Sequence, residues 1–219
     1  MRYYNSLGPK LSSGSGAIYP CSNARLPSTQ PKRAMAIKAT VFKAALQIAD
    51  MDRHYYVDHA LTLARHPSET DERMMVRLLA FALYADELLA FGKGISSDEE
   101  PDLWQKDLTG AIKRWIVVGL PDERAIRKAC GRAAQVVVIS YGRAANIWWN
   151  ENRDKLQRLN NLTVLNLASE TTLALAALAS RNMQLQCTLQ ENDIMMTSAA
   201  GMIEIEPKVW QGSFRSVNG

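Results

Sequence analysis

The chain has 219 residues, of which 47% are hydrophobic and 22% are charged, as expected of a globular domain with a substantial core. Its net charge is +4, but the first 34 residues contain five basic residues and no acid, so residues 35–219 carry −1. Because residues 35–219 are nearly neutral, their net charge is weak evidence that the domain binds nucleic acid. No stretch reaches the ~18 consecutive apolar residues of a membrane span, so no membrane association is expected.

Residues 1–34 are rich in Ser, Gly and Pro and show neither helical nor strand periodicity, which predicts a disordered basic extension. Met35 would itself make a natural start of translation, so the extension is interpreted as a mis-assigned start or a dispensable segment. A targeting arm is the alternative. We expect one domain over residues 35–212, followed by a flexible tail over residues 213–219.

The three cysteines, Cys21, Cys130 and Cys187, are far apart and form no CxxC pair. This spacing predicts neither a zinc site nor a disulfide framework. Three isolated thiols are typical of a protein in a reducing compartment, so a cytoplasmic location is expected.

The first elements along the chain are expected to be a strand over residues 40–48 and a second strand from Tyr55 to about Pro67, joined as a hairpin. Ser68 then has the character of a helix N-cap, because acids follow it in the first helical turn. Apolar residues recur at helical spacing as far as about Phe91. The pattern therefore predicts a long, largely buried helix.

The remainder of the chain alternates strands and helices. An acidic loop, which includes Asp98, Glu99, Glu100 and Asp102, is expected to be solvated. Later strands are predicted at 111–118, 136–139, 162–167, 183–190, 194–197 and 202–206, and helices from Asp122, around Trp148 and at 173–178. This order predicts an α/β (α+β) fold, a mixed β-sheet flanked by helices, with an N-terminal hairpin and a C-terminal antiparallel meander.

Three segments carry a resemblance to a known family: residues 64–77 (ARHPSETDERMMVR), residues 98–123 (DEEPDLWQKDLTGAIKRWIVVGLPDE) and residues 141–149 (YGRAANIWW). In this order they resemble the bacterial YaeQ family, over residues 35 to about 212. The resemblance implies a variant of the PD-(D/E)XK, restriction-endonuclease-like fold. In that fold an acid on one strand and an acid on the next hold a divalent metal. The family has no settled activity, so the resemblance implies a fold more than a function.

The chain departs from its relatives at that metal site. In relatives the sequence of the central strand resembles acid-Leu-Trp-Ile-acid. This chain has Lys113 and Val117 at the two acidic positions. Mg²⁺ or Mn²⁺ needs several oxygen ligands, and a lysine repels the ion while a valine offers it none. If the family uses this site, this chain is predicted to have lost much of it.

Asp107 and Glu72 remain as candidate catalytic and metal-binding residues, with Glu69 as a further candidate metal ligand. Each has a structural alternative. Asp107 begins an Asp-Leu-Thr-Gly turn, and acids in a first helical turn stabilise the helix by about 0.3–1 kcal/mol each. If Lys113 faces inward, it could pair with Asp107, and a salt bridge would then replace the metal.

A basic stripe is predicted on the outer face of the helix that begins at Asp122. Its members are Arg124, Arg127, Lys128 and Arg132. Such a stripe can contact a phosphate backbone, although a solvated helix face is the alternative. A basic patch on residues 35–219 would favour nucleic acid over a protein partner.

Three functions are consistent with these residues. The favoured one is a catalytically impaired, nuclease-like scaffold that binds nucleic acid or a protein partner. The alternative is a phosphodiesterase that depends on Mg²⁺ or Mn²⁺ and uses Asp107 with a helix acid. In the third, the motif residues serve only turns and caps, and the function lies elsewhere.

Overall fold

The computed structural model describes residues 39–92 and 100–214. The predicted extension at residues 1–34, Asp98 and Glu99 of the acidic loop, and the end of the predicted tail lie outside these residues. No helix in the described part of the chain is long and apolar enough to cross a membrane.

The first sheet, which we call sheet A, begins with the expected hairpin. Its strands are β1 (Thr40–Asp50), β2 (Tyr55–Arg65), β8 (Asn182–Gln190), β9 (Asp193–Ser198) and β10 (Gly201–Ile205), in the spatial order β10-β9-β8-β1-β2. β1 and β2 are antiparallel, as are β8, β9 and β10, while β1 and β8 run parallel. The predicted hairpin and meander are therefore confirmed, and they meet in one sheet.

The second sheet, sheet B, contains the predicted buried strands. Its strands are β3 (Leu89–Phe91), β4 (Leu103–Lys106), β5 (Ile112–Val118), β6 (Ala133–Tyr141), β7 (Leu162–Leu167) and β11 (Lys208–Gln211), in the order β11-β7-β6-β5-β4-β3. β5, β6 and β7 are parallel, and the other pairs are antiparallel. The apolar side chains of β6 are buried on both faces of the sheet, as its β-branched run predicts.

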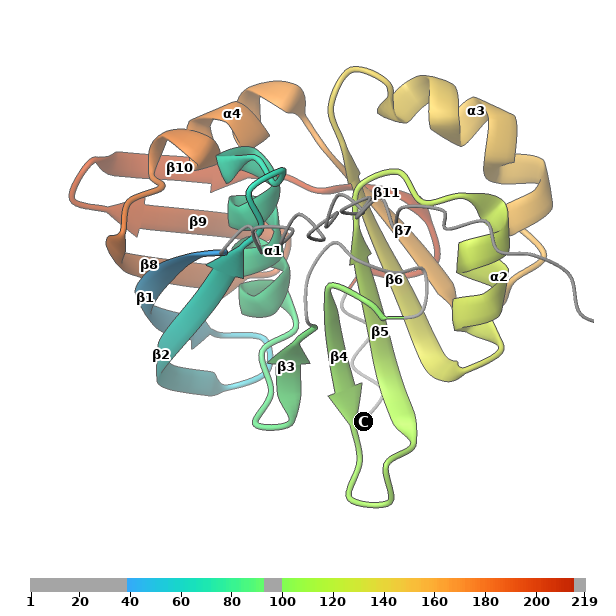
Figure 1. The fold of residues 1–219 in the computed structure, drawn as a ribbon, viewed down its shortest axis with the longest axis horizontal. Helices are drawn as coiled ribbons and strands as arrows, with labels where there is room; N and C mark the ends of the chain where they lie inside the picture. The colour runs from blue at the N-terminus through green and yellow to red at the C-terminus, as the bar shows by residue number, and fades with distance from the viewer. Residues whose placement is uncertain (1–38, 93–99, 215–219) are drawn as a thin grey trace, which may run out of the picture. The chain divides into compact units, whose positions relative to one another are not determined.

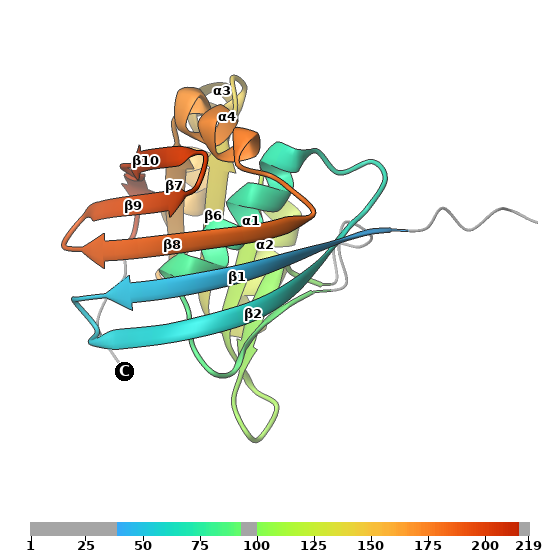
Figure 2. The ribbon, with the colours of Figure 1, turned by 90° about the vertical axis from the view of Figure 1, so that its left-hand side faces the viewer.

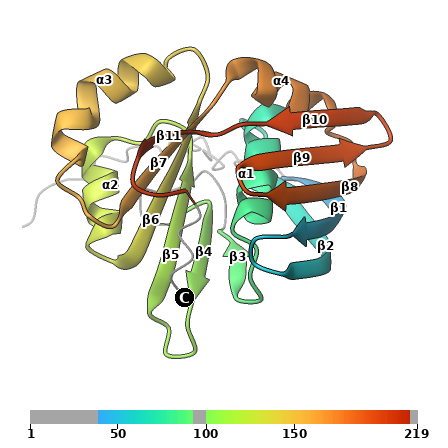
Figure 3. The same ribbon diagram turned by 180° about the vertical axis from the view of Figure 1, so that it is seen from behind.

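Four helices cover the sheets: α1 (Asp71–Leu83), α2 (Glu123–Cys130), α3 (Ala145–Leu156) and α4 (Ser169–Ala177). α1 lies between the inner face of sheet A and one face of sheet B, and α2 and α3 lie side by side over the other face of sheet B (Figures 1 and 3). Among the described residues, no helix covers the outer face of sheet A, as Figure 2 shows. Along β8, polar side chains on this face alternate with buried apolar side chains on the inner face, a pattern typical of a sheet with one wet face.

The α+β class is confirmed, but the strands β3, β4 and β11 were not predicted from the sequence, and two further features differ from the prediction. The strands divide between two sheets where one was expected, because strand patterns define an inner face but not which strands pair. The first helix is also shorter, since it ends at Leu83 and the chain turns at Asp86 before β3. Leu89 and Phe91 of β3 pack in the same core as the helix. The apolar spacing therefore continues past the end of the helix, which is why the sequence predicted a helix as far as about Phe91.

Candidate functional site

Four charged side chains form a buried network beside the carboxyl end of β5. They are Glu69, Arg73, Arg77 and Asp102, and three of them, Glu69, Arg77 and Asp102, expose 5% or less of their surface. Buried charges are costly unless they are paired and hydrogen-bonded. We call this set the arginine-carboxylate network.

Asp102 joins the network to sheet B. It directly precedes β4, and its backbone N–H donates to the carbonyl of Ile116 (3.0 Å). One carboxylate oxygen, Oδ2, accepts from the backbone N–H of Val118 (2.7 Å), and the other, Oδ1, lies 2.6 Å from Nη2 of Arg73. The prediction of a solvated loop at Asp102 was therefore wrong, because both oxygens of this carboxylate have buried partners.

Glu69 joins the network to α1. Its carboxylate lies 3.1 Å from Nη1 of Arg73, and Arg77 places Nε at 2.8 Å from Oε1 and Nη2 at 3.1 Å from Oε2. Glu69, Arg73 and Arg77 are spaced four residues apart. This spacing places Arg73 and Arg77 on one side of α1, with Glu69 on the same side just before the helix begins. The α1 N-cap is Thr70, whose Oγ1 accepts from the N–H of Arg73 (3.1 Å), so the prediction of Ser68 as the N-cap was wrong.

Tyr141, at the end of β6, lies close to these charges. Burial raises the pKa of Tyr141 to about 12; the Arg73 charge opposes the rise, and the carboxylates of Glu72 and Asp102 add to it. The hydroxyl is therefore protonated at neutral pH and acts as a neutral polar group at the edge of the network.

The donor set does not fit a divalent cation. A hard cation needs several oxygen ligands without competing positive charge, whereas the carboxylates of Glu69 and Asp102 each contact an arginine. Among residues 39–92 and 100–214, no three His, Cys, Asp or Glu side chains are grouped as a metal site.

The structure does not bring Asp107 to the network. Asp107 and Asp102 are five residues apart along the β4–β5 hairpin, a separation of roughly 16 Å along an extended strand. Asp107 instead organises the hairpin turn: Oδ1 accepts from the N–H of Thr109 (2.8 Å), the hydroxyl of Thr109 (2.6 Å) and the N–H of Ala111 (3.0 Å). These hydrogen bonds, that of the Thr109 hydroxyl above all, lower the pKa of Asp107.

The acids at the start of α1 have separate partners. Asp71 forms an ion pair with Arg65 of β2, and Glu72 accepts a hydrogen bond from the hydroxyl of Thr172 in α4 (2.6 Å). Glu69 alone enters the network. The structure therefore does not gather Asp107, Glu69 and Glu72 around one point.

The two substituted positions also lie apart. Lys113 lines a cavity at the other end of sheet B, and Val117 packs with the apolar cluster beneath α2 and α3. The positive charge of Lys113 contributes to the lowered pKa of Asp107, but no ion pair joins these two residues, both of which the structure describes. The structure therefore does not form the Asp107–Lys113 salt bridge that was considered from the sequence.

The predicted basic stripe is on α2 and on the turn that follows it. Its members Arg124, Arg127, Lys128 and Arg132 are all exposed. Arg127 lies 2.6 Å from Glu123, whereas Arg124 and Arg132 have no acidic partner in the described part of the chain. The stripe therefore presents positive charge to solvent.

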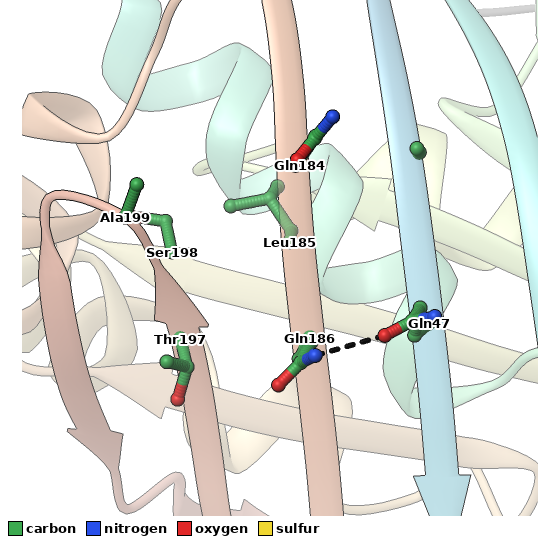
Figure 4. Close-up of a pocket in the computed structure, with 8 residues that line it drawn as sticks. Gln47, Gln184, Leu185, Gln186, Thr197, Ser198 and Ala199 are labelled. Atoms are coloured by element: carbon green, nitrogen blue, oxygen red, sulfur yellow. Dashed lines mark hydrogen bonds between the residues drawn. The ribbon is translucent and has the colours of Figure 1, made fainter.

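A shallow cavity of about 530 Å³ lies on the outer face of sheet A. Figure 4 shows the glutamines that line it, with Nε2 of Gln186 donating to Oε1 of Gln47 (2.9 Å). Among the described residues that line it, none is titratable, so the hydroxyls of Thr197 and Ser198 have no acid or base beside them in this lining.

Sequence reasoning missed Asp102, Arg73 and Arg77. The signals were the four-residue spacing of Glu69, Arg73 and Arg77, and an arginine within an otherwise apolar helix. An arginine in a fully buried helical stretch needs a charged partner. For Arg77 that partner is Glu69, eight residues earlier in the chain, whereas Asp102 of the acidic run before β4 pairs with Arg73.

Comparison with known proteins gives a consistent relationship. A model of the YaeQ protein family matches residues 35–207. Proteins named "Uncharacterized protein YaeQ" from Escherichia coli (strain K12) and Salmonella typhi are each 47% identical over 178 residues, covering 81% of this chain and 98% of theirs.

Solved structures agree with these relatives. The YaeQ protein from Xanthomonas axonopodis pv. citri is 50% identical, with a TM-score of 0.77 over 80% of this chain and 99% of its own. The YaeQ protein from Pseudomonas syringae is 32% identical, with a TM-score of 0.77 over 80% of this chain and 97% of its own.

Proposed function

The chain belongs to the YaeQ family, and we propose that it is a metal-independent nucleic-acid-binding protein without a hydrolytic centre. The observation that carries this proposal is the pairing of the buried carboxylates with arginines: Glu69 and Asp102 pair within the arginine-carboxylate network, and Asp50 pairs with Arg53. Arginine is permanently protonated, so each of these carboxylates faces a fixed positive charge. The resemblance to PD-(D/E)XK nucleases stays a prediction.

The location of the basic residues favours nucleic acid over a protein partner. Residues 121–160 contain eight basic and four acidic residues, a net charge of +4, although residues 35–219 together carry −1. All eight basic side chains are exposed, and the helices that carry most of them, α2 and α3, cover the same face of sheet B. A local basic layer on a neutral body can contact phosphates without relying on net charge.

The test measures binding and hydrolysis of the same labelled DNA and RNA strands by the full chain. Fluorescence anisotropy should give equal affinity in EDTA and in Mg²⁺ at matched ionic strength, since no step depends on a metal. The double variant Arg124→Glu/Arg132→Glu should weaken binding at least about tenfold and reduce the slope of log K against log salt by about 2. The strands should stay intact in every buffer.

A matched control places the same charge reversals on sheet A. Lys43→Glu/Arg181→Glu changes two exposed residues away from α2 and α3, and it should leave the affinity within about twofold of wild type. Equal losses in both double variants would reduce the proposal to non-specific charge attraction and contradict it. Hydrolysis in Mn²⁺ that disappears in Asp107→Ala would contradict it in favour of the phosphodiesterase.

A further inference from the structure

A second polar region lies at the opposite end of sheet B from the arginine-carboxylate network. A cavity of about 820 Å³ opens near the amino ends of β5, β6 and β7, and its lining includes Lys113, Arg114, Gln105, Gln135 and Asp86. Ligand pockets for small molecules have volumes of about 300–1,000 Å³. The cavity is therefore large enough for a small metabolite.

Arg114 is the central side chain of this cavity. Its Nε donates to Oε1 of Gln135 (3.0 Å), its Nη1 donates to Oε1 of Gln105 (3.2 Å), and its guanidinium lies 5.0 Å from the ring centre of Tyr84. Three neutral groups thus hold it in a fixed orientation. Nη2 has no protein partner in the described part of the chain, and no carboxylate lies within 4.0 Å of the guanidinium there.

The charge of Arg114 is only partly compensated. Arg114 is half-buried, and this burial lowers the pKa of its guanidinium. Lys113 adds a second positive charge to the lining, and Asp86 supplies the one carboxylate among the lining residues named above. Arg53, also in the lining, is already paired with Asp50 at 2.6 Å.

The two glutamines add hydrogen-bond donors. Each directs its amide oxygen to Arg114, so each amide nitrogen faces away from that bond. Neither nitrogen has a hydrogen-bond partner among residues 39–92 and 100–214. A fixed guanidinium, an ammonium and two amide NH₂ groups make a lining rich in donors, which suits an oxyanion rather than a cation.

We propose that this cavity binds a small molecule through a carboxylate or phosphate group, which the Arg114 fork and the amide nitrogens of Gln105 and Gln135 hold. This site is separate from the nucleic-acid surface of α2 and α3. Its occupant is small, because the cavity has a volume of about 820 Å³. Arginine is suited to both candidate groups, since its planar fork matches either oxyanion with two parallel hydrogen bonds.

The test uses citrate, inorganic phosphate and AMP as probes, titrated into the full chain by calorimetry to about 10 mM. Citrate reports on a carboxylate ligand, and phosphate and AMP report on a phosphate ligand. At least one probe should bind wild type. Gln135→Glu should weaken that binding at least about tenfold, because the new carboxylate occupies the Arg114 fork and repels the anion.

Gln135→Glu is expected to stay folded, because it gives Arg114 a carboxylate partner, and its melting midpoint should not fall. Gln184→Glu is the matched control, since it makes the same change at an exposed position on the outer face of sheet A (Figure 4). Its affinity should equal that of wild type. Arg114→Lys, which keeps the charge and loses the fork, should also bind at least about tenfold more weakly.

Two results would overturn this proposal: no binding of any of the three probes, or equal binding by wild type and Gln135→Glu. Neither bears on the proposed function, because Gln135→Glu should leave the anisotropy of labelled DNA and RNA unchanged. If the two sites are separate, Arg124→Glu/Arg132→Glu should lose nucleic-acid binding and still bind the small probe.

Discussion

The two ends of sheet B hold arginines in opposite ways. Beside the carboxyl end of β5, Arg77 is 2% exposed and lies against the carboxylate of Glu69, which also contacts Arg73. Near the amino ends of the strands, Arg114 is half-buried against two amide oxygens and an aromatic ring. In the first arrangement both arginines have carboxylate partners, so the buried charges compensate one another. The second leaves charge and donors available.

The largest effect is expected from Arg77→Met. The variant leaves the buried carboxylate of Glu69 with Arg73 as its one remaining arginine, and breaking a buried ion pair costs about 3–5 kcal/mol. Urea denaturation followed by circular dichroism should show this loss as a lower midpoint at constant slope. A loss below about 1 kcal/mol would mean that Arg77 acts only as an apolar filler.

Arg114→Met makes the same substitution at the open end, and it should cost about 1 kcal/mol or less. Removing a charge that has no carboxylate partner leaves two amide oxygens at a solvent-filled cavity, where water can replace the lost donors. The same urea series measures it. Equal losses for Arg77→Met and Arg114→Met would abolish the distinction between a closed and an open end.

Thr172→Val tests the hydrogen-bond partner of Glu72, the second acid of α1. The hydroxyl of Thr172 is buried and donates to Glu72, so its removal should cost about 1 kcal/mol. Glu72→Gln provides the control, because an amide oxygen can still accept this hydrogen bond, and it should cost less. A larger loss in Glu72→Gln would assign Glu72 to the network rather than to α4.

The smallest effect is expected from Asp107→Asn. Because the folded pKa of Asp107 lies below its usual value of 3.8, its carboxylate contributes stability above pH 3.8 that is lost as the pH falls through the lower folded pKa. The variant should therefore lower the melting midpoint slightly at pH 7 and hardly at all at pH 2. Asp58→Asn, which removes an acid from an exposed strand position, should show no such pH dependence.

Local sequence patterns predicted those elements well whose own residues mark a buried face or an end. The strict alternation in β8 and the acid at the N-cap of α2 correspond to what the structure shows, with Asp122 accepting from the N–H of Ala125 (2.7 Å). The assembly of sheet A depends on β1 pairing with β8, and these strands are separated by more than 130 residues. No local pattern encodes that pairing.

The candidate site was predicted less well for a physical reason. Asp102 stands in an acidic run and Arg73 lies 29 residues before it, so their contact exists only after α1 packs on sheet B. Asp107 was selected from the family motif, and the same motif is what a tight turn requires. Turn and ligand chemistry use the same carboxylate, and only its neighbours in the folded chain distinguish them.

The central claim is that arginines, rather than a metal, neutralise the buried carboxylates of this chain. Thermal unfolding of the full chain in EDTA, Mg²⁺ and Mn²⁺, beside Asp102→Asn, tests it most directly. A metal at about 100 times its dissociation constant would stabilise the native state by about 2.7 kcal/mol. We expect the wild-type midpoint to be the same in all three buffers. A rise in Mn²⁺ that Asp102→Asn abolishes would contradict the claim.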